Sequence, residues 1–251
     1  MIEIKSISAG YGKKRVLDGL DATLCAGELT GVIGVNGCGK STLLNAVRGA
    51  LPLTDGEIII DGESLSRMRS AQVAKKIAYL PQGKQVPDMT VGQMVLHGRF
   101  PYLSFPRRYS ERDRKIAADA MERVRISHLA DQPLASLSGG MRQIACIAMA
   151  LAQDTDYILL DEPTAYLDIS HQLELMRVLG ELCREGKGIV AVMHDLPIAF
   201  DFCDRVLALH DGKTAVCATP ADACASDVIG DIFGVGVAYS TEQEKYIYSY
   251  K

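Results

Sequence analysis

Long apolar runs are missing from this 251-residue sequence. None approaches the length of about 18 residues that a membrane-spanning helix needs. The first residues, MIEIKSIS, alternate apolar and polar side chains and lack the apolar block of a signal peptide. We therefore expect any role at a membrane to depend on a partner protein that itself spans the bilayer.

Cysteine pairs at metal-binding spacing are also missing. The chain has seven cysteines, an odd number, and no pair of them forms C-x-x-C. Neither a disulfide framework nor a zinc site is indicated, and reduced thiols in the cytosol are the simplest interpretation. An excess of positive charge is lacking too. The formal net charge of −4 argues against a nucleic-acid partner, because proteins that bind nucleic acid usually carry a basic surface.

What is present suits a globular protein with a sizeable core, since 48% of the residues are hydrophobic and 23% are charged. Apolar runs bounded by turn residues predict strands at 2–7, 20–24, 29–34, 57–60, 77–80, 157–161 and 188–193. Helical patterns are found at 41–48, 112–125, 140–153, 171–185 and 196–203. Strands alternate with helices after residue 154, which predicts a mainly parallel sheet. No clear strand is expected between residues 83 and 153.

The segment GVNGCGKS at 34–41 fits the phosphate-loop pattern G-x-x-x-x-G-K-[ST], between a predicted strand and a predicted helix. Glycines let backbone N–H groups converge on phosphate oxygens, and the helix N-terminus adds a favourable partial charge. In such a loop Lys40 reaches the β- and γ-phosphates, and the hydroxyl of Ser41 can ligate Mg²⁺. A chance glycine turn is the alternative, which the flanking elements disfavour.

A second motif, YILLDEP at 157–163, predicts a core strand that ends in two acids. Asp161 would lie at the C-terminal edge of the sheet, where ligands of open α/β sheets bind. It could bind Mg²⁺ directly or through water, and Glu162 could orient or deprotonate the attacking water. Two solvated acids at a strand end are the alternative. The phosphate loop disfavours this alternative, because it needs an acid at this place.

Four further residues are candidates on weaker grounds. Gln82 and His194 follow strands whose ends should open onto the nucleotide, although each alone is more often an ordinary polar residue. Tyr11, in a predicted loop, could stack on an adenine ring. Cys38 lies close to a lysine and a helix N-terminus, so we expect its thiolate form to be favoured. The alternative is that Cys38 merely fills a tolerant position.

The stretch LSGGMRQ at 137–143, just before a predicted helix, resembles the signature of ATP-binding cassette ATPases. The other elements of that family occur in the expected order over about residues 1–225: Tyr11, GVNGCGKST, Gln82, LSGGMRQ, YILLDEP, AYLD at 165–168, and His194. One departure is Tyr166, where a serine-alanine-leucine-aspartate loop would more usually carry alanine. Asp168 is retained, so we expect the loop to keep its role.

This resemblance implies ATP and Mg²⁺ as cofactors and assigns a role to each motif. Catalytic roles would belong to Glu162, His194, Gln82 and Lys40. Mg²⁺ would be held by Ser41, Gln82 and Asp161. The chain's own ATP would be bound by Tyr11, Gly34, Asn36, Gly37, Cys38, Gly39, Lys40, Ser41, Thr42, Asp161 and Asp168. Two copies of such a cassette face each other head to tail, so Ser138, Gly139 and Gly140 would contact the ATP held by the opposite chain.

The expected fold class is therefore α/β. It combines a P-loop nucleotide-binding core with a mainly parallel sheet, an N-terminal antiparallel β subdomain and an inserted helical subdomain. We expect one ATPase domain over residues 1–225, with its core at 1–82 and 154–225 and the helical subdomain at 83–153. Residues 226–251 would form a short, weakly patterned C-terminal extension.

The type of cassette can be narrowed further. Residues 42–137 lack the sustained heptads of DNA-linked cassettes, and translation-linked types usually carry two cassettes in one chain. The stretch VLHGRFPYLSFPRRYSER at 95–112 resembles cassettes of iron-chelate, haem and vitamin B12 importers, where this surface faces the permease. Its arginines, Arg99, Arg107, Arg108 and Arg112, could equally be a plain solvated face.

We therefore expect an importer ATPase that acts as a homodimer beneath two permease subunits, at the cytoplasmic face of the cell membrane. An extracytoplasmic substrate-binding protein would take part indirectly. The alternatives are import of another metal or solute, and a soluble cassette such as one serving iron–sulphur assembly.

Overall fold

The computed structural model describes residues 1–81, 87–165, 167–243 and 245–250. Two residues of the motifs above, Gln82 and Tyr166, lie outside this part of the chain. In the described part, no helix is long and apolar enough to cross a bilayer.

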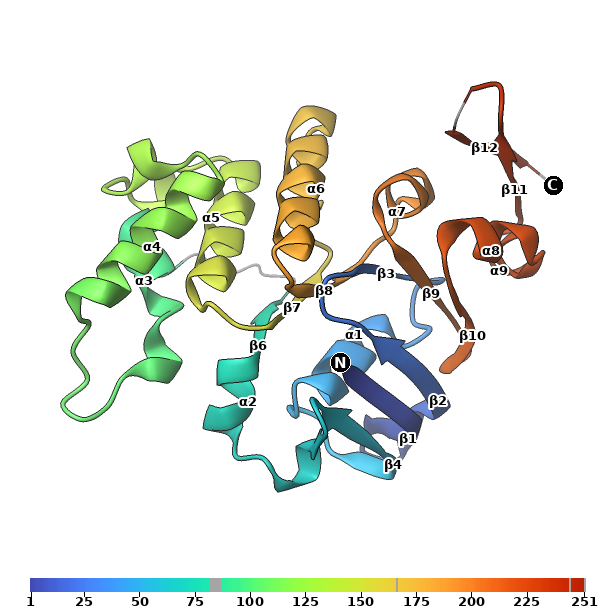
Figure 1. Cartoon of the computed structure of the whole chain (residues 1–251), viewed down its shortest axis with the longest axis horizontal. Helices are drawn as coiled ribbons and strands as arrows, with labels where there is room; N and C mark the ends of the chain where they lie inside the picture. The colour runs from blue at the N-terminus through green and yellow to red at the C-terminus, as the bar shows by residue number, and fades with distance from the viewer. Residues whose placement is uncertain (82–86, 166, 244, 251) are drawn as a thin grey trace.

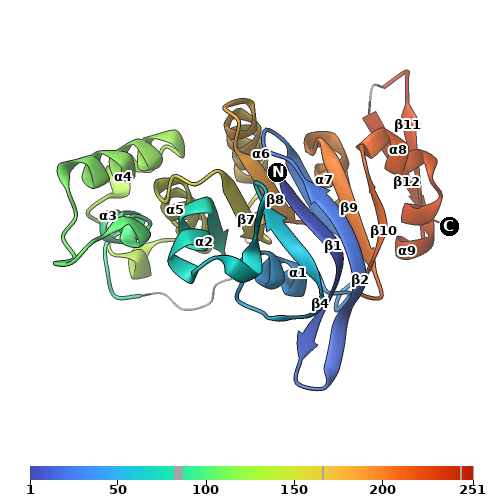
Figure 2. The same ribbon diagram turned by 60° about the horizontal axis from the view of Figure 1, so that its bottom comes forward.

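The N-terminal third of the chain builds an antiparallel sheet in the order β2-β1-β4-β5. Its strands are β1 (Ile2–Tyr11), β2 (Lys14–Leu24), β4 (Leu53–Ile60) and β5 (Glu63–Ser64). In β1 the side chains of Ile2 and Ile4 are buried, as the alternation of a half-buried strand requires. The predicted antiparallel N-terminal sheet is thus confirmed (Figure 2).

The central sheet has the order β10-β9-β3-β8-β7-β6. Its strands are β3 (Leu29–Ile33), β6 (Ile77–Leu80), β7 (Tyr157–Asp161), β8 (Gly188–Val192), β9 (Arg205–His210) and β10 (Lys213–Ala218). Neighbouring strands run parallel, except that β10 is antiparallel to β9. The predicted mainly parallel sheet is confirmed. Strands β9 and β10 were not predicted from the sequence.

Helices cover both faces of the central sheet. The helices that precede the C-terminal part are α1 (Lys40–Val47), α2 (Ser70–Lys76), α3 (Val91–His97), α4 (Glu111–Arg123), α5 (Gly139–Ala152), α6 (Ile169–Arg184) and α7 (Leu196–Phe202). One core contains the side chains of Ile158 and Leu160 from β7 together with those of α5, α6 and α7. The other contains Leu159 of the same strand, with α1 and the antiparallel sheet. Alternation along the buried strand thus supplies two hydrophobic cores.

Between β6 and β7 the chain forms helices α3, α4 and α5, which gather at one end of the molecule (Figure 1). We call described residues 87–153 the helical segment. As expected, its described residues form no strand. Side chains cap all three helices: Thr90 caps α3, Ser110 caps α4 by accepting from the backbone N–H of Asp113, and Ser138 caps α5. The division of the chain into core and subdomain at residues 82/83 and 153/154 stays a prediction.

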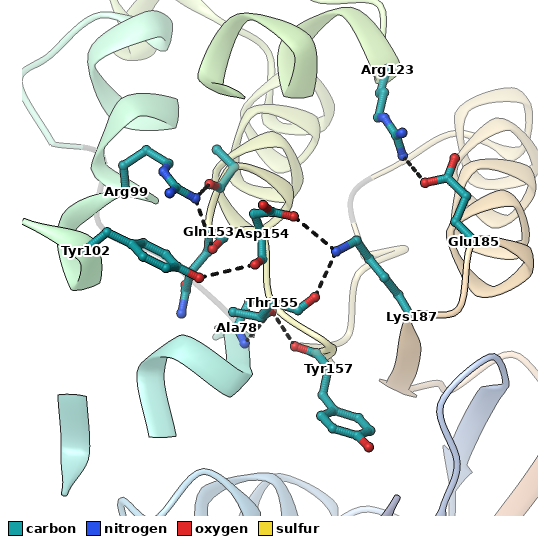
Figure 3. Close-up of polar contacts among 11 residues, drawn as sticks. Ala78, Arg99, Tyr102, Arg123, Gln153, Asp154, Thr155, Tyr157, Glu185 and Lys187 are labelled. Carbon is teal, nitrogen blue, oxygen red and sulfur yellow. Dashed lines mark hydrogen bonds and ion pairs between the residues drawn. The ribbon is translucent and has the colours of Figure 1, made fainter. Parts of the chain in front are cut away.

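Arg99, just after α3, is a buried residue of the helical segment that contacts both α4 and α5 (Figure 3). It is only 5% exposed. Its Nε donates to Oδ1 of Asp113 at 3.0 Å, and its Nη1 donates to the carbonyl oxygen of Ala152 at 3.0 Å. The guanidinium also lies 4.0 Å from the centre of the Tyr102 ring. Both interpretations of Arg99, as part of a solvated face or as a docking residue, are therefore wrong. A buried cation needs a charged partner and hydrogen bonds, and Arg99 has Asp113 as its charged partner and donates from Nε and Nη1.

Polar side chains tie the helical segment to the central sheet. Gln153, just after α5, donates from Nε2 to the carbonyl oxygens of Ala74 at 2.6 Å and Ile77 at 3.1 Å. Thr155 is buried and accepts from the N–H of Ala78 at 3.1 Å (Figure 3). These contacts fix α5 against the start of β6, so the helical segment and the sheet share one buried seam.

The C-terminal part is more ordered than the sequence predicted. Helices α8 (Pro220–Ala225) and α9 (Val228–Phe233) precede a hairpin of β11 (Val235–Ser240) and β12 (Lys245–Tyr250). In both views this part lies at the end of the molecule opposite the helical segment (Figures 1 and 2). The ring of Tyr246 meets that of Phe200 edge-on at 5.1 Å, which packs the hairpin against α7. The strand-forming residues at 235–237 (VGV) and 246–248 (YIY) were the available signal.

Candidate nucleotide-binding and hydrolysis site

The loop between β3 and α1 holds the glycine-rich motif in a tight backbone turn. Gly34 has a φ of 149° and Gly39 a φ of 112°, and residues other than glycine rarely adopt this backbone region. A Cβ atom at Gly34 would also lie 2.4 Å from the carbonyl oxygen of Leu209. The loop can therefore approach neighbouring backbone, and a ligand, only because glycine stands at these positions.

Lys40 is folded back over this loop. Its Nζ donates to the carbonyl oxygens of Gly34 at 2.6 Å and Val35 at 3.1 Å, and the residue is 7% exposed. Lys40 is also the first residue of α1, and the first turn of that helix contains no acidic side chain. A fixed ammonium and a helix N-terminus therefore lie together, which is an arrangement that binds anions such as phosphate.

Asp161 ends β7 and lies beside α1. It is 4% exposed, and its Oδ1 accepts a hydrogen bond from the Ser41 hydroxyl at 3.1 Å. Burial raises the pKa of the Asp161 carboxyl, and the hydrogen bond from Ser41 opposes that shift. Both groups reach this place because β7 is separated from β3 by β8 alone, and all three strands run parallel.

The oxygens of Ser41 and Asp161 fit a magnesium ion. Mg²⁺ prefers hard oxygen ligands, and in nucleotide sites it is held by one or two protein groups together with phosphates and waters. A hydroxyl and a carboxylate 3.1 Å apart supply such a pair. In the described part of the chain, no cluster of three His, Cys, Asp or Glu side chains could hold a metal alone. The hydroxyl of Ser41 and the carboxylate of Asp161 leave the rest of such an ion's coordination shell to phosphates and waters.

Glu162 and His194 lie at the ends of the adjacent strands β7 and β8. Nε2 of His194 is 2.7 Å from Oε1 of Glu162. Glu162 has a positive φ of 56°, a conformation uncommon for a glutamate, and it turns the chain away from the strand direction. A pocket opens between these two side chains and the phosphate loop. Its lining residues are Val16, Asn36, Gly37, Gly39, Lys40, Ser41, Thr42, Glu162 and His194. Most of the predicted phosphate-loop residues thus line one pocket together with Glu162 and His194.

The remaining candidates do not line this pocket. Tyr11 ends β1 at the turn into β2 and is 54% exposed. Ser138 caps α5, where its Oγ accepts from the N–H of Met141 at 3.2 Å, and Gly139 and Gly140 begin that helix. Asp168 caps α6 and accepts from the N–H of His171 at 2.9 Å. The described pocket is built without the signature motif, whose helix N-terminus is open to solvent.

Cys38 departs from its predicted chemistry. Burial raises the pKa of the Cys38 thiol, and the neighbouring charge of Lys40 only partly opposes that effect. The residue is 5% exposed and does not line the pocket. A Cβ atom at Gly34 would lie 2.6 Å from its Sγ, so the thiol packs under the loop. The expectation that its surroundings favour thiolate is wrong, because desolvation outweighs the nearby cation.

Two neighbours of the site were not predicted from sequence. Val16 lines the pocket from β2, and no sequence pattern pointed to it. The hydroxyl of Tyr79, on β6, lies 3.5 Å from Oδ2 of Asp161. A signal for Tyr79 was available, because it stands three residues before Gln82 in a strand that should end beside the nucleotide.

Comparisons with known proteins agree with this geometry. The family model described as ABC transporter matches residues 17–165. The petrobactin import ATP-binding protein FpuD of Bacillus anthracis is 40% identical over 243 residues, which cover 96% of this chain and 89% of that protein. The ferric enterobactin transport ATP-binding protein FepC of Escherichia coli K12 is 40% identical over 233 residues, covering 92% and 86%.

Solved structures give the same result. A bacterial ABC transporter cassette, solved as a dimer, superposes with a TM-score of 0.77 at 29% identity and covers 88% of this chain and 99% of its own. A metal-chelate type ABC transporter in an inward-facing conformation superposes with a TM-score of 0.82 at 25% identity, covering 99% and 95%. Cassettes of this kind function as dimers. The chain therefore belongs to the ABC transporter family and forms its ATP-binding, ATP-hydrolysing cassette.

Proposed function

We propose that this chain is the ATPase subunit of an importer that takes up an iron chelate such as a siderophore, haem or a corrinoid. The observation that carries the proposal is the pocket in which the phosphate loop, Glu162 and His194 meet. The substrate class is supported by the petrobactin and enterobactin relatives, which align over almost the whole chain. An importer of another metal or solute and a soluble cassette in iron–sulphur assembly are the alternatives.

In the proposed mechanism the loop and Lys40 bind the β- and γ-phosphates of ATP. Ser41 and Asp161 would hold Mg²⁺, and Gln82, which lies outside the described residues, would be the further ligand that the sequence suggests. The ion, when bound, neutralises charge that develops on the transferred phosphoryl group. Glu162 accepts a proton from the attacking water, and His194 orients the Glu162 carboxylate through their 2.7 Å contact.

The exposed N-terminus of α5 acts on a second copy of the chain. Ser138 and the N–H groups of Gly139 and Gly140 contact the γ-phosphate of ATP that the opposite chain holds, since a helix N-terminus binds anions without a charged side chain. The glycines allow the close backbone approach that this needs. Tyr11 stacks on the adenine, and Asp168, just before α6, takes part in binding the chain's own ATP. ATP binding then closes a homodimer, and hydrolysis releases it.

The stretch 95–112 carries the permease-docking surface in this proposal, with its exposed arginines beyond the buried Arg99. Phe105 is 96% exposed, and the side chain of Arg107 lies 4.9 Å from the centre of the Phe100 ring. Arg107, Arg108 and Arg112 are all exposed, in contrast to Arg99. The surface therefore offers the exposed rings of Phe100 and Phe105 and three exposed arginines to a partner. Two such cassettes dock beneath two permease subunits at the cytoplasmic face of the membrane, and an extracytoplasmic substrate-binding protein delivers the chelate.

Charge reversal tests the docking surface. The double variant Arg107→Glu/Arg108→Glu is expected to leave the isolated cassette folded and active but to weaken co-purification with the permease. Arg184→Glu, an exposed arginine at the end of α6, serves as the matched control. Co-purification of the wild-type chain with the permease of an unrelated solute class, or with no membrane protein, would contradict the proposed function.

A further inference from the structure

The side chain of Tyr79 lies on the same face of the central sheet as Asp161. Strands β6 and β7 are parallel neighbours in which Tyr79 pairs with Leu159. Side chains alternate between the faces of a sheet, so Asp161, two residues beyond Leu159, lies on the face that carries Tyr79. The Tyr79 hydroxyl is 3.5 Å from Oδ2 of Asp161, whereas Ser41 donates to Oδ1. The two carboxylate oxygens are thus faced by hydroxyls from two different elements.

Helix α1 holds Tyr79 from its other side. The guanidinium of Arg48 lies 4.3 Å from the centre of the Tyr79 ring, and its Nε donates to Oδ1 of Asn45 at 2.9 Å. Ser41, Asn45 and Arg48 stand at i, i+4 and i+7, so they share one face of the helix. This face contacts both Tyr79 and Asp161, and the arginine fixes the ring through a cation–π contact.

We propose that Tyr79 is a positioning residue for the carboxylate of Asp161, and so tunes how tightly the site holds Mg²⁺. This rests on the proposed function, in which Asp161 binds the ion. A contact of 3.5 Å is longer than a full O–H···O hydrogen bond of about 2.5–3.0 Å. It still limits rotation of the carboxylate, because the hydroxyl and the Ser41 contact lie at opposite oxygens. Outer partners of metal ligands orient those ligands, and their loss typically weakens metal binding by about 10–100-fold.

Loss of the Tyr79 hydroxyl should therefore affect metal binding and not nucleotide binding. Tyr79 does not line the pocket formed by the phosphate loop, so its hydroxyl should not affect ATP affinity when the metal is removed. Loss of the hydroxyl is expected to lower affinity for the ion about tenfold, the lower end of that range. The lower end is expected because the contact is long and Ser41 still holds the other oxygen.

The test uses the full chain and the variant Tyr79→Phe, which keeps the ring and its stacking. Mn²⁺, a probe for the Mg²⁺ site, is titrated in the presence of ATP and followed by electron paramagnetic resonance. ATP affinity is measured separately in EDTA. Tyr102→Phe is the matched control, since its hydroxyl donates to the carbonyl oxygen of Asp154 at 3.2 Å, outside the pocket.

We expect Tyr79→Phe to lower Mn²⁺ affinity about tenfold with unchanged ATP affinity in EDTA, and Tyr102→Phe to match the wild type. Wild-type Mn²⁺ affinity in Tyr79→Phe would overturn the inference. A parallel loss of ATP affinity in EDTA would also overturn it, since Tyr79 would then support the loop. Failure of the wild-type chain to bind ATP would instead contradict the proposed function. Arg48→Met is an independent variant that leaves the Tyr79 hydroxyl in place but removes the cation–π contact with its ring. It should also lower Mn²⁺ affinity and leave ATP affinity in EDTA unchanged.

Discussion

Nε2 of His194 lies 2.7 Å from Oε1 of Glu162, although 32 residues separate them in sequence. Parallel strands β7 and β8 bring them together, because Asp161 pairs with Val192 and each residue follows its strand by one or two positions. The contact orients the Glu162 carboxylate towards the pocket that the phosphate loop lines. A carboxylate held this way suits a general base.

Replacing Glu162 should separate hydrolysis from binding. Glu162→Gln keeps the size of the side chain but removes the proton acceptor. We expect it to bind MgATP as the wild type does, to accumulate the closed dimer, and to lose about 10²–10⁴-fold in turnover. Equilibrium binding of MgATP, size-exclusion chromatography with ATP and single-turnover hydrolysis measure these three effects in turn. Turnover at the wild-type rate would end the assignment of Glu162 as the base.

Lys40→Ala should show the opposite pattern. It removes the ammonium that Gly34 and Val35 hold within the loop, and with it the charge placed for the β- and γ-phosphates. Nucleotide affinity should fall, so ATP should no longer drive dimer closure. Equilibrium binding of a fluorescent ATP analogue measures this loss. Affinity equal to that of Glu162→Gln would show that Lys40 does not contact the phosphates.

The Cys38 thiol should react slowly with alkylating reagents near neutral pH. Burial raises its pKa above the ordinary thiol value, so less thiolate is present at pH 7, and the rate should climb as pH rises. Mass spectrometry after iodoacetamide treatment can follow this residue in the native and the urea-unfolded chain. Bound ATP should slow the reaction further. Labelling as fast in the folded chain as in the unfolded one would contradict the prediction.

Arg99 should contribute more to stability than its exposed neighbours do. Arg99→Met leaves the buried Asp113 without its cation, and removing one partner of a buried pair costs about 3–5 kcal/mol. Arg112→Met, at an exposed position nearby, should change the free energy of unfolding by less than about 0.5 kcal/mol. Urea denaturation of both variants decides the matter. Equal losses would show that the Arg99–Asp113 pair is not a structural anchor.

The signature motif should act across the dimer. Ser138→Arg leaves its own phosphate loop intact but places a bulky side chain at the exposed start of α5. Each homodimer of Ser138→Arg or of Lys40→Ala should be nearly inactive. A mixed dimer has one site built from two intact halves, so single-turnover hydrolysis should reappear on mixing.

Coupled closure of the two sites would hide one intact site in a hydrolysis assay, so ATP trapping is measured alongside hydrolysis in the mixed dimers. Mass spectrometry of the intact assembly verifies that mixed dimers are present. If neither assay recovers in their presence, the signature does not complete the opposite chain's site.

The site could be predicted well where its residues follow strands. The phosphate loop, Asp161, Glu162 and His194 all come directly after apolar runs, and parallel strands bring such ends to one edge. Arg99 could not be interpreted this way, because its burial depends on Asp113 of a different helix. The Cys38 prediction failed for a related reason: sequence shows the neighbouring lysine but not the packing of the thiol under the loop.

The position of Tyr79 beside Asp161 depends on strand register, which the sequence alone does not set. Strands β9 and β10 were missed although the Asp211-Gly212 turn between them is a hairpin signal. The ordered C-terminal hairpin was missed because its packing partner, Phe200, lies far away in the chain. In each case the deciding contact is between segments that the sequence does not place side by side.

Both ends of the helical segment connect to adjacent strands, β6 and β7, which pair from Ile77 with Tyr157 to Leu80 with Leu160. The whole interval between them is thus one crossover connection, and a single helix would be enough to connect two parallel strands. Because β6 and β7 pair directly, a change in the length of this interval need not alter the strand order or move the acids that follow β7. The interval carries the proposed docking surface and the signature motif at 137–143, whereas the phosphate loop, Asp161 and Glu162 lie outside it.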